Sequence, residues 1–226
     1  MKTVNIAIDG PAGAGKSSLA KAVAAKLGYT YIDTGALYRA IAFKTLQLGI
    51  TISDLVSIKQ MLLRTTISFR HINGTQCVYV DGKDVTGKIR TNEISSAASA
   101  ISAIPDVRSF LLGLQRDIAS KENVVMDGRD IGTVVLPNAD IKIFLTASVE
   151  ERAKRRYEEQ KNTIGSVTYE EIVSTMITRD KNDSERAVAP LKPATDAIIL
   201  DNSGFESHQT LESALNIIEN KLKNAL

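Results

Sequence analysis

The stretch that decides the fold is IAIDGPAGAGKSS, residues 6–18. A short apolar run leads into a glycine-rich turn, which ends in a lysine and two hydroxyl side chains. The spacing G-x-x-x-x-G-K-[ST] is matched by Gly10, Gly15, Lys16 and Ser17. A strand-like run precedes the turn and a helical pattern follows it, which is the context in which such a turn binds a polyphosphate. A glycine-rich helix cap would not require both flanks, so we predict a phosphate-binding loop.

Each part of this loop has a physical task. Backbone N–H groups and the N-terminus of the following helix face the anion, and the glycines let the backbone approach it closely. Lys16 is suited to the β- and γ-phosphates, and the Ser17 hydroxyl is suited to bind Mg²⁺. The residues that we expect to contact ATP are Gly10, Pro11, Ala12, Gly13, Ala14, Gly15, Lys16, Ser17 and Ser18.

Composition limits the possible functions. The chain has 226 residues, 43% of them hydrophobic, and a formal net charge of +2. This length suits one α/β domain with an inserted subdomain, and this charge argues against nucleic acid as a partner. A single cysteine, Cys77, excludes an intramolecular disulfide framework, and no apolar stretch is long enough to suggest a membrane span. We expect a cytoplasmic monomer that binds neither nucleic acid nor a membrane.

Short β-branched runs alternate with helical patterns along the chain, which predicts a parallel sheet covered by helices. The predicted strands are residues 4–9, 29–33, 123–127, 141–147 and 197–201. The gap between the second and third strands is longer than one crossover helix requires. We therefore expect an insert there.

The insert is predicted to contain a β-hairpin, TISFRHINGTQCVYVDGKDVT, at residues 66–86. Asn73-Gly74 supplies the turn, because both residues tolerate a positive φ. The apolar residues that alternate on its two pairing faces are Ile67, Phe69, Val78 and Val80. Helical patterns near 53–64 and 91–101 flank the hairpin, and LESALNIIENKLKNAL predicts a C-terminal packing helix.

A second motif, DTGALYRA at residues 33–40, follows the second predicted strand and opens a helix. Thr34, Tyr38 and Arg39 can project from one helical turn toward the strand ends, where open α/β sheets bind ligands. The alternative to a binding role is purely structural: Thr34 would only cap the helix, and Tyr38 would only pack.

A third motif, VVMDGRDIGT, weakens that alternative. Asp127 ends an apolar strand, where phosphate-loop enzymes place a carboxylate that acts on Mg²⁺ or its water shell. Arg129 and Asp130 follow and are expected to face a substrate. The chain lacks the [NT]-K-x-D signature of a guanine-binding switch, and its size does not suit a motor. Of the classes of phosphate-loop protein, this leaves a small-molecule phosphotransferase.

Four stretches together resemble the bacterial cytidylate kinase family: GPAGAGKSS, DTGALYR, DGRDIGTVVLP and RDKNDSERAVAPL. The likeness runs from about residue 4 to 201, and the hairpin insert resembles the enlarged nucleotide-binding insert of the family. Adenylate and guanylate kinases share the core but lack this combination. The resemblance implies that the chain transfers the γ-phosphoryl group of ATP to CMP or dCMP with Mg²⁺.

The resemblance also implies a domain plan. It is a phosphate-loop core with a five-stranded parallel sheet, at about 1–60 and 103–226, with an inserted nucleotide-binding lobe at about 61–102 and a lid at about 152–168.

Site residues follow from the same resemblance. The catalytic set is Lys16, Asp127, Arg129 and Arg186, and the metal ligands are Ser17 and Asp127. The acceptor-binding set is Thr34, Tyr38, Arg39, Ser99, Arg108, Arg129, Asp130, Arg179, Asp183 and Arg186. Arg156 is expected to contact ATP. Ser99, Arg108 and Asp130 are expected to face the base, and Arg179 and Asp183 the sugar.

Spacing supports part of this set. Positions 179, 183 and 186 stand at i, i+4 and i+7, which predicts one helix face, although a solvated charged row has the same spacing. The individual roles of Arg152, Arg155 and Arg156 stay open, because a salt-bridged surface helix has the same composition. Two other functions stay open: a kinase for UMP, AMP or shikimate, and a catalytically silent nucleotide-binding regulator.

Overall fold

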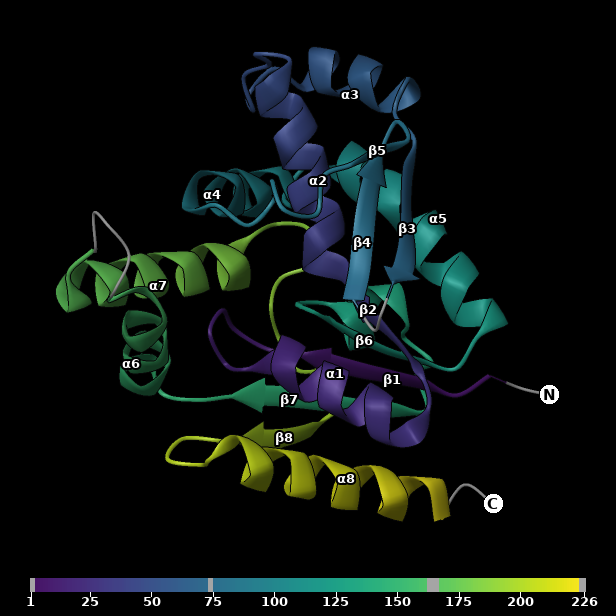
Figure 1. The fold of residues 1–226 in the computed structure, drawn as a ribbon, viewed down its shortest axis with the longest axis vertical. Coiled ribbons are helices and arrows are strands. Elements are labelled where there is room, and N and C mark those ends of the chain that lie inside the picture. The colour runs from purple at the N-terminus through teal and green to yellow at the C-terminus, as the bar shows by residue number, and fades with distance from the viewer. Residues whose placement is uncertain (1–2, 73–74, 162–166, 224–226) are drawn as a thin grey trace. The chain divides into compact units, whose positions relative to one another are not determined.

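The computed structural model describes residues 3–72, 75–161 and 167–223 (Figure 1). The chain divides into two compact units, one formed by Met1–Tyr31 with Glu122–Leu226 and the other by Ile32–Lys121. The predicted insert at 61–102 lies wholly within the second unit. Residues 162–166 of the predicted lid, and the predicted Asn73-Gly74 turn, lie outside the described residues.

The first unit is built around the parallel sheet. Its elements are β1 (Asn5–Asp9), α1 (Lys16–Leu27), β2 (Thr30–Asp33, which begins here), β6 (Val124–Gly128), the π-helix η1 (Ile131–Val135), β7 (Ile141–Thr146), α6 (Val149–Gln160), α7 (Tyr169–Glu185), β8 (Ile198–Asp201) and α8 (Ser207–Lys223). The strand order is β2-β6-β1-β7-β8, so all five predicted strands are confirmed. In the parallel register, Ile6 lies opposite Val125 on one side and Ile141 on the other.

These strands read as apolar runs because helices cover the sheet. β1 is fully buried from Ile6 onward. Its Ile8 shares one core with Val23 of α1 and Ile218 of α8. The helices α1 and α8 also pack against each other, and α8 lies alongside β8 (Figure 1). The predicted C-terminal packing helix is thereby confirmed.

The phosphate-binding loop connects β1 to α1, and its glycines are required by its backbone. Gly10 and Gly13 have φ values of 150° and 77°, which L-residues with side chains rarely adopt. A Cβ at Gly10 would also collide with the carbonyl oxygen of Leu145 on β7. Gly15 precedes α1 with a φ of 89°, and no side chain caps this helix N-terminus.

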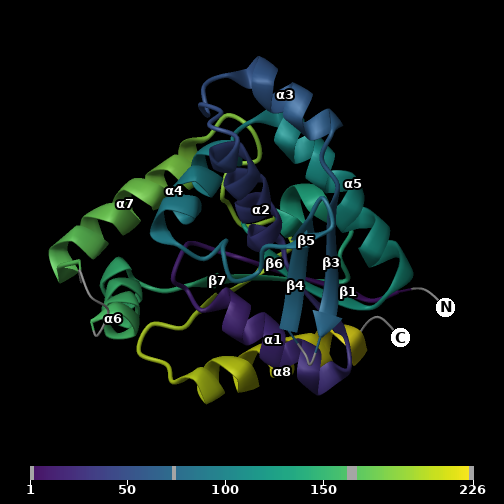
Figure 2. The same cartoon turned by 45° about the horizontal axis from the view of Figure 1, so that its top comes forward.

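The second unit is one continuous segment, whose described residues form four helices and a three-stranded antiparallel sheet. Its elements are α2 (Thr34–Gln47), α3 (Leu55–Leu63), β3 (Ile67–Ile72), β4 (Thr75–Val80), β5 (Lys83–Asp84), α4 (Asn92–Ile101) and α5 (Pro105–Lys121). The strands β3 and β4 run side by side in antiparallel fashion (Figure 2). Ile67 lies opposite Val80 and Phe69 opposite Val78, so the predicted hairpin register is confirmed.

One hydrophobic core joins the elements of this unit. Leu37 and Ile41 of α2, Val78 of β4, Ile101 of α4 and Leu111 of α5 are all buried in it. The hairpin therefore does not stand alone, since a two-stranded ribbon gains stability by packing against helices.

The helices α6 and α7 pack against each other through Ala153, Ile172 and Met176 (Figure 1). Thr168 begins α7 with a capping box, in which its hydroxyl accepts from the backbone of Glu171 and the Glu171 carboxylate accepts from the backbone of Thr168. In the described part of the chain, no single helix is long and apolar enough to cross a membrane. Of the described helices, only α4 and α5 taken together reach that length and composition, and they are bent by 98° relative to each other.

Candidate active site

Lys16 lies inside the phosphate-binding loop. Its Nζ donates a hydrogen bond to the carbonyl oxygen of Pro11 at 2.6 Å, and the side chain is buried. Burial lowers the pKa of Lys16 well below its ordinary value, and the nearby Arg129 lowers it further, as does Arg179. Asp127 and Asp9 act in the opposite direction. The half-buried Arg129 and Arg179 therefore lie near enough to act on the buried Lys16, which suits a ligand with several negative charges.

Ser17 and Asp127 form a second group at the start of α1. Ser17 Oγ donates to Asp127 Oδ2 at 2.8 Å, and the hydroxyl of Tyr31 donates to Asp127 Oδ1 at 3.0 Å. The sequence predicted the first pair as metal ligands. A hydroxyl and a carboxylate fit Mg²⁺, which takes one or two protein oxygens together with phosphate oxygens. Within the described residues no group of three or more His, Cys, Asp or Glu residues could hold a metal.

Two ion pairs join the residues that follow β6 to the end of α7. Arg129 Nε donates to Asp183 Oδ2 at 2.9 Å. Arg186 Nη2 donates to Asp130 Oδ1 at 3.3 Å, and both of these side chains are 6% exposed. Four predicted site residues thus form two ion pairs, because the residues that follow β6 lie beside the end of α7.

The helix argument for the row 179, 183 and 186 was wrong for its last member. The helix α7 ends at Glu185, and Arg186 has extended backbone with φ −62° and ψ 140°. Arg186 still reaches Asp130 because the chain turns at that point, so the convergence has a different cause from the one that spacing suggested.

Asp9 links the phosphate-binding loop to the segment that carries Asp130. Its carboxylate accepts hydrogen bonds from the backbone N–H groups of Ile131 at 2.8 Å and Gly132 at 2.7 Å. These are the first residues of the π-helix, whose N–H groups have no partners within the helix itself. Burial raises the pKa of Asp9 to about 6, and the two backbone hydrogen bonds oppose that rise.

Arg152 braces the phosphate-binding loop. Its guanidinium donates to the carbonyl oxygens of Ala147 and Ala12, each at 3.0 Å, and to Asp180 Oδ2 at 2.6 Å. The side chain is only 4% exposed, so these hydrogen-bond partners, and not water, stabilise its charge. We therefore assign Arg152 a structural place between the loop and α7.

The other two arginines of α6 differ from Arg152. Arg155 donates to Asn202 through both the side-chain oxygen and the backbone carbonyl, at 3.2 and 2.8 Å. Asn202 in turn donates to the carbonyl oxygen of Ala14 in the phosphate-binding loop. Arg156 forms a surface ion pair with Glu159 at 3.3 Å. The predicted contact of Arg156 with ATP stays a prediction.

The second unit gathers the remaining predicted residues, first around Asp33. Asp33 Oδ1 accepts from the backbone of Ala36 at 2.8 Å and so caps α2. Its Oδ2 accepts from Arg39 Nη2 at 2.9 Å and lies 3.8 Å from Arg90 Nη2. A Cβ at Gly35 would lie 3.0 Å from Arg39 Nη1, so the small residue leaves room for the guanidinium over the helix start.

A second cluster of this unit contains Tyr38 and Arg108. The guanidinium of Arg108 lies 5.7 Å from the ring centroid of Tyr38, within the range of a cation–π contact. Arg108 also donates to the carbonyl oxygen of Ser102 at 3.1 Å, and Ser102 donates to the carbonyl oxygen of Ser99. Three of the predicted residues, Tyr38, Ser99 and Arg108, are thereby connected. Thr34 is the buried first residue of α2 and Asp33 is its cap, so the alternative in which Thr34 acts only as a cap is wrong.

Sequence reasoning missed five residues that the structure places at these clusters. They are Asp9, Tyr31, Asp33, Arg90 and Asn202. Asp9 and Asp33 stand inside the quoted motifs, where their position beside a glycine loop and at a helix start could have revealed them. Tyr31, Arg90 and Asn202 have no local signal.

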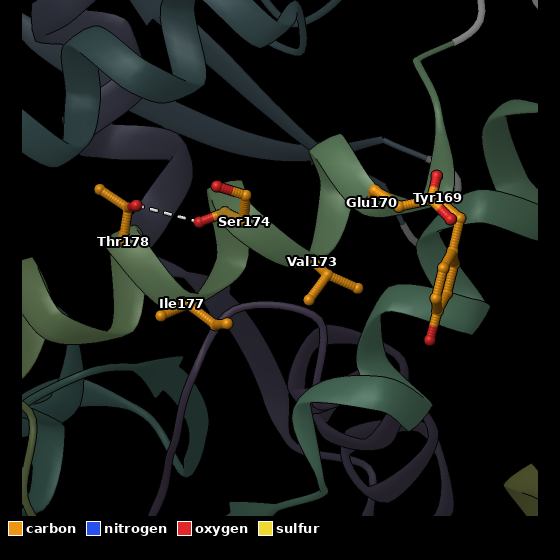
Figure 3. A pocket seen from close by; sticks show the side chains of 6 residues that line it. All are labelled: Tyr169, Glu170, Val173, Ser174, Ile177 and Thr178. Atoms are coloured by element: carbon orange, nitrogen blue, oxygen red, sulfur yellow. Dashed lines mark hydrogen bonds between the residues drawn. The ribbon is translucent and has the colours of Figure 1, made fainter.

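A hollow on α7 is separate from these clusters. It has a volume of about 390 Å³, and Figure 3 shows its lining residues, Tyr169, Glu170, Val173, Ser174, Ile177 and Thr178. The Thr178 hydroxyl donates back to the carbonyl oxygen of Ser174. None of the six is basic, so the hollow offers no positively charged side chain to a phosphate.

Comparisons with known proteins agree with this arrangement. A family model described as Cytidylate kinase matches residues 6–220. The cytidylate kinase of Caldicellulosiruptor bescii is 47% identical over 224 residues, covering 99% of each chain. That of Bacillus subtilis is 48% identical over 220 residues, covering 97% of this chain and 98% of the relative. A gluconokinase structure from Sinorhizobium meliloti shares the fold, with a TM-score of 0.52 at 16% identity, covering 98% of this chain and 95% of that one.

Proposed function

Because the chain belongs to the cytidylate kinase family, we propose that it transfers the γ-phosphoryl group of ATP to CMP or dCMP. The observation that carries the proposal is Lys16, which is buried in the phosphate-binding loop, with the half-buried Arg129 and Arg179 near enough to lower its pKa. These basic side chains would pair with the negative charges of a bound triphosphate. The two relatives named above are cytidylate kinases, and this chain matches each of them over nearly its whole length.

The reaction needs no nucleophilic side chain. An oxygen of the CMP phosphate forms a bond to the γ-phosphorus, the bond from that phosphorus to the β,γ-bridging oxygen breaks, and ADP leaves with the electron pair. The transition state spreads charge over the oxygens of the transferred group, so catalysis is mainly positioning and electrostatic stabilisation. Lys16 and Arg129 supply that stabilisation from the first unit.

Ser17 and Asp127 would hold Mg²⁺, which when bound neutralises charge on the β- and γ-phosphates. Ser17 is the second residue of α1 and Asp127 lies in β6, so the helix and the sheet fix both oxygens before any ligand arrives. Tyr31 holds the second carboxylate oxygen of Asp127 and so restricts its rotation.

Acceptor recognition is assigned residue by residue. Asp130 as a carboxylate is suited to accept from the N4 amino group of cytosine. Arg108 is suited to donate to O2 or N3 of the base, and Thr34 and Arg39 to bind the phosphate at the start of α2. Uracil presents an oxygen where cytosine presents N4, so a carboxylate at that place discriminates against UMP.

An ADP-release assay with ATP and a panel of acceptors tests the proposal. We expect turnover with CMP and dCMP and much slower turnover with UMP, AMP and shikimate. Preference for another member of the panel would assign a different kinase activity. No ADP release with any acceptor, together with ATP binding by calorimetry, would favour the silent regulator.

A further inference from the structure

Gln76 connects the inserted hairpin to the start of α2. Its Oε1 accepts from the backbone N–H of Asp33 at 2.9 Å, and its Nε2 donates to the backbone carbonyl of Asp33 at 3.2 Å. The side chain is buried and comes from β4, 43 positions along the chain. One amide thus satisfies both backbone groups of a single residue.

This contact fixes the orientation of the amide. A backbone N–H can only donate and a carbonyl oxygen can only accept, so the oxygen and nitrogen of Gln76 can be placed in only one way. At this position of β4, a carboxylate would lack the donor, and the shorter amide of asparagine would not reach both backbone groups. The pair is therefore specific for glutamine.

Asp33 is the residue on which the phosphate-binding end of α2 depends. Its carboxylate caps the helix at Ala36 and pairs with Arg39 at 2.9 Å, and Arg90 lies 3.8 Å from the same oxygen. A rotation of the Asp33 backbone would move the helix start and both guanidinium groups together.

We propose that Gln76 is a positioning residue for the acceptor phosphate: by holding the backbone of Asp33, it sets the helix N-terminus and the arginines that bind the phosphate of CMP. The inserted hairpin thereby serves recognition of the acceptor phosphate. Arg90 is the second guanidinium of this group. The inference rests on the proposed function, because it names the residue that orients one part of that site.

The same unit offers a matched control. Gln115 of α5 is 1% exposed and therefore as buried as Gln76, which is 5% exposed. Within the part of the chain that the structure describes, neither amide atom of Gln115 has a hydrogen-bond partner. Replacing this glutamine by leucine removes a buried amide of the same size without breaking a contact to Asp33.

The experiment compares Gln76→Leu with Gln115→Leu and the parent protein in steady-state kinetics. We expect Gln76→Leu to raise the KM for CMP about tenfold or more while the KM for ATP changes less than about twofold, because misplaced binding groups affect the ligand they hold. Gln115→Leu should leave both constants near the parental values. Circular dichroism and thermal unfolding establish that each variant is folded.

Should Gln76→Leu fail to fold, Gln76→Glu takes its place, since it keeps the acceptor for the Asp33 N–H and loses the donor to the Asp33 carbonyl. The same selective rise in the KM for CMP is expected. An unchanged KM for CMP, an equal rise for CMP and ATP, or the same rise in Gln115→Leu would overturn the positioning role. A parent protein that does not phosphorylate CMP would instead overturn the proposed function, and the inference with it.

Discussion

Ser17 donates a hydrogen bond to Asp127 across 2.8 Å, although 110 positions separate them in the chain. The contact exists because the loop after β1 and the end of β6 lie at the same edge of the sheet, where parallel strands bring their carboxyl ends together. Tyr31 completes the arrangement from β2. Three neighbouring strands therefore hold one hydroxyl and one carboxylate in a fixed geometry.

Asp127→Asn should raise the Mg²⁺ concentration that gives half-maximal activity by about 10- to 100-fold, because the amide carries no charge for the cation. A magnesium titration of the initial rate measures this. Asp140→Asn is the control, since Asp140 accepts a backbone hydrogen bond from Asn5 at the other end of β1. An unchanged magnesium requirement in Asp127→Asn would remove Asp127 from the metal ligands.

Lys16→Ala should lower kcat by about 10²- to 10³-fold, because Lys16 stabilises charge on the donor phosphates. CMP affinity, measured by isothermal titration, should survive. Lys26 lies exposed in the last turn of the same helix, so Lys26→Ala controls for a general loss of positive charge. Loss of CMP affinity together with activity would count against a donor-side role for Lys16.

Asp130→Ala should narrow the ratio of kcat/KM for CMP over UMP by about tenfold or more, since the carboxylate that accepts from N4 is gone. The substitution also removes the partner of Arg186, which lies 3.3 Å away. Arg186→Ala separates the two effects, because it should lower both values of kcat/KM and leave their ratio near the parental one. If Asp130→Ala keeps that ratio, Asp130 does not read the base.

Asp9 should make stability depend on pH between about 4 and 7. Burial raises its folded-state pKa from 3.8 to about 6, while Asp130 adds to this rise and Lys16 opposes it. A raised carboxyl pKa means that the folded state binds the proton more tightly than the unfolded state. The stabilisation is therefore fully present below pH 3.8 and is lost as the pH rises through 6.

Urea unfolding of the parent and of Asp9→Asn at pH 4 and pH 7 measures this dependence. The free energy of unfolding of the variant, relative to the parent, should increase by about 2 kcal/mol between the two pH values. A difference that stays constant with pH would show that Asp9 titrates at the same pH in both states.

The sequence predicted the sheet well because its signal is local. Each of the five strands is a short apolar run between helical patterns, and the central strands β1 and β6 are buried almost throughout, as such runs predict. The hairpin register followed for the same reason, since Ile67 and Phe69 alternate toward the core opposite Val80 and Val78. The π-helix Ile131–Val135 had no such signal, because it depends on Asp9 from another strand.

The candidate site was predicted where motif spacing defines it and was missed where partners come from elsewhere. Lys16 and Ser17 are fixed by the loop that contains them. Arg186 was placed on a helix face, although α7 ends one residue earlier and the side chain reaches Asp130 from extended backbone. Periodicity cannot locate a helix end to one residue, because end residues are held by contacts outside the helix.

By itself the sequence determined the phosphate-binding loop, the parallel strands and the hairpin, since each depends on residues that are close together in the chain. Only the tertiary structure decided which polar groups pair: Asp127 with Ser17 and Tyr31, and Asp33 with Gln76. Those pairs join segments tens of residues apart. Their partners are selected by strand order and by the strong tendency of buried polar groups to form hydrogen bonds, and neither constraint is visible until the chain is folded.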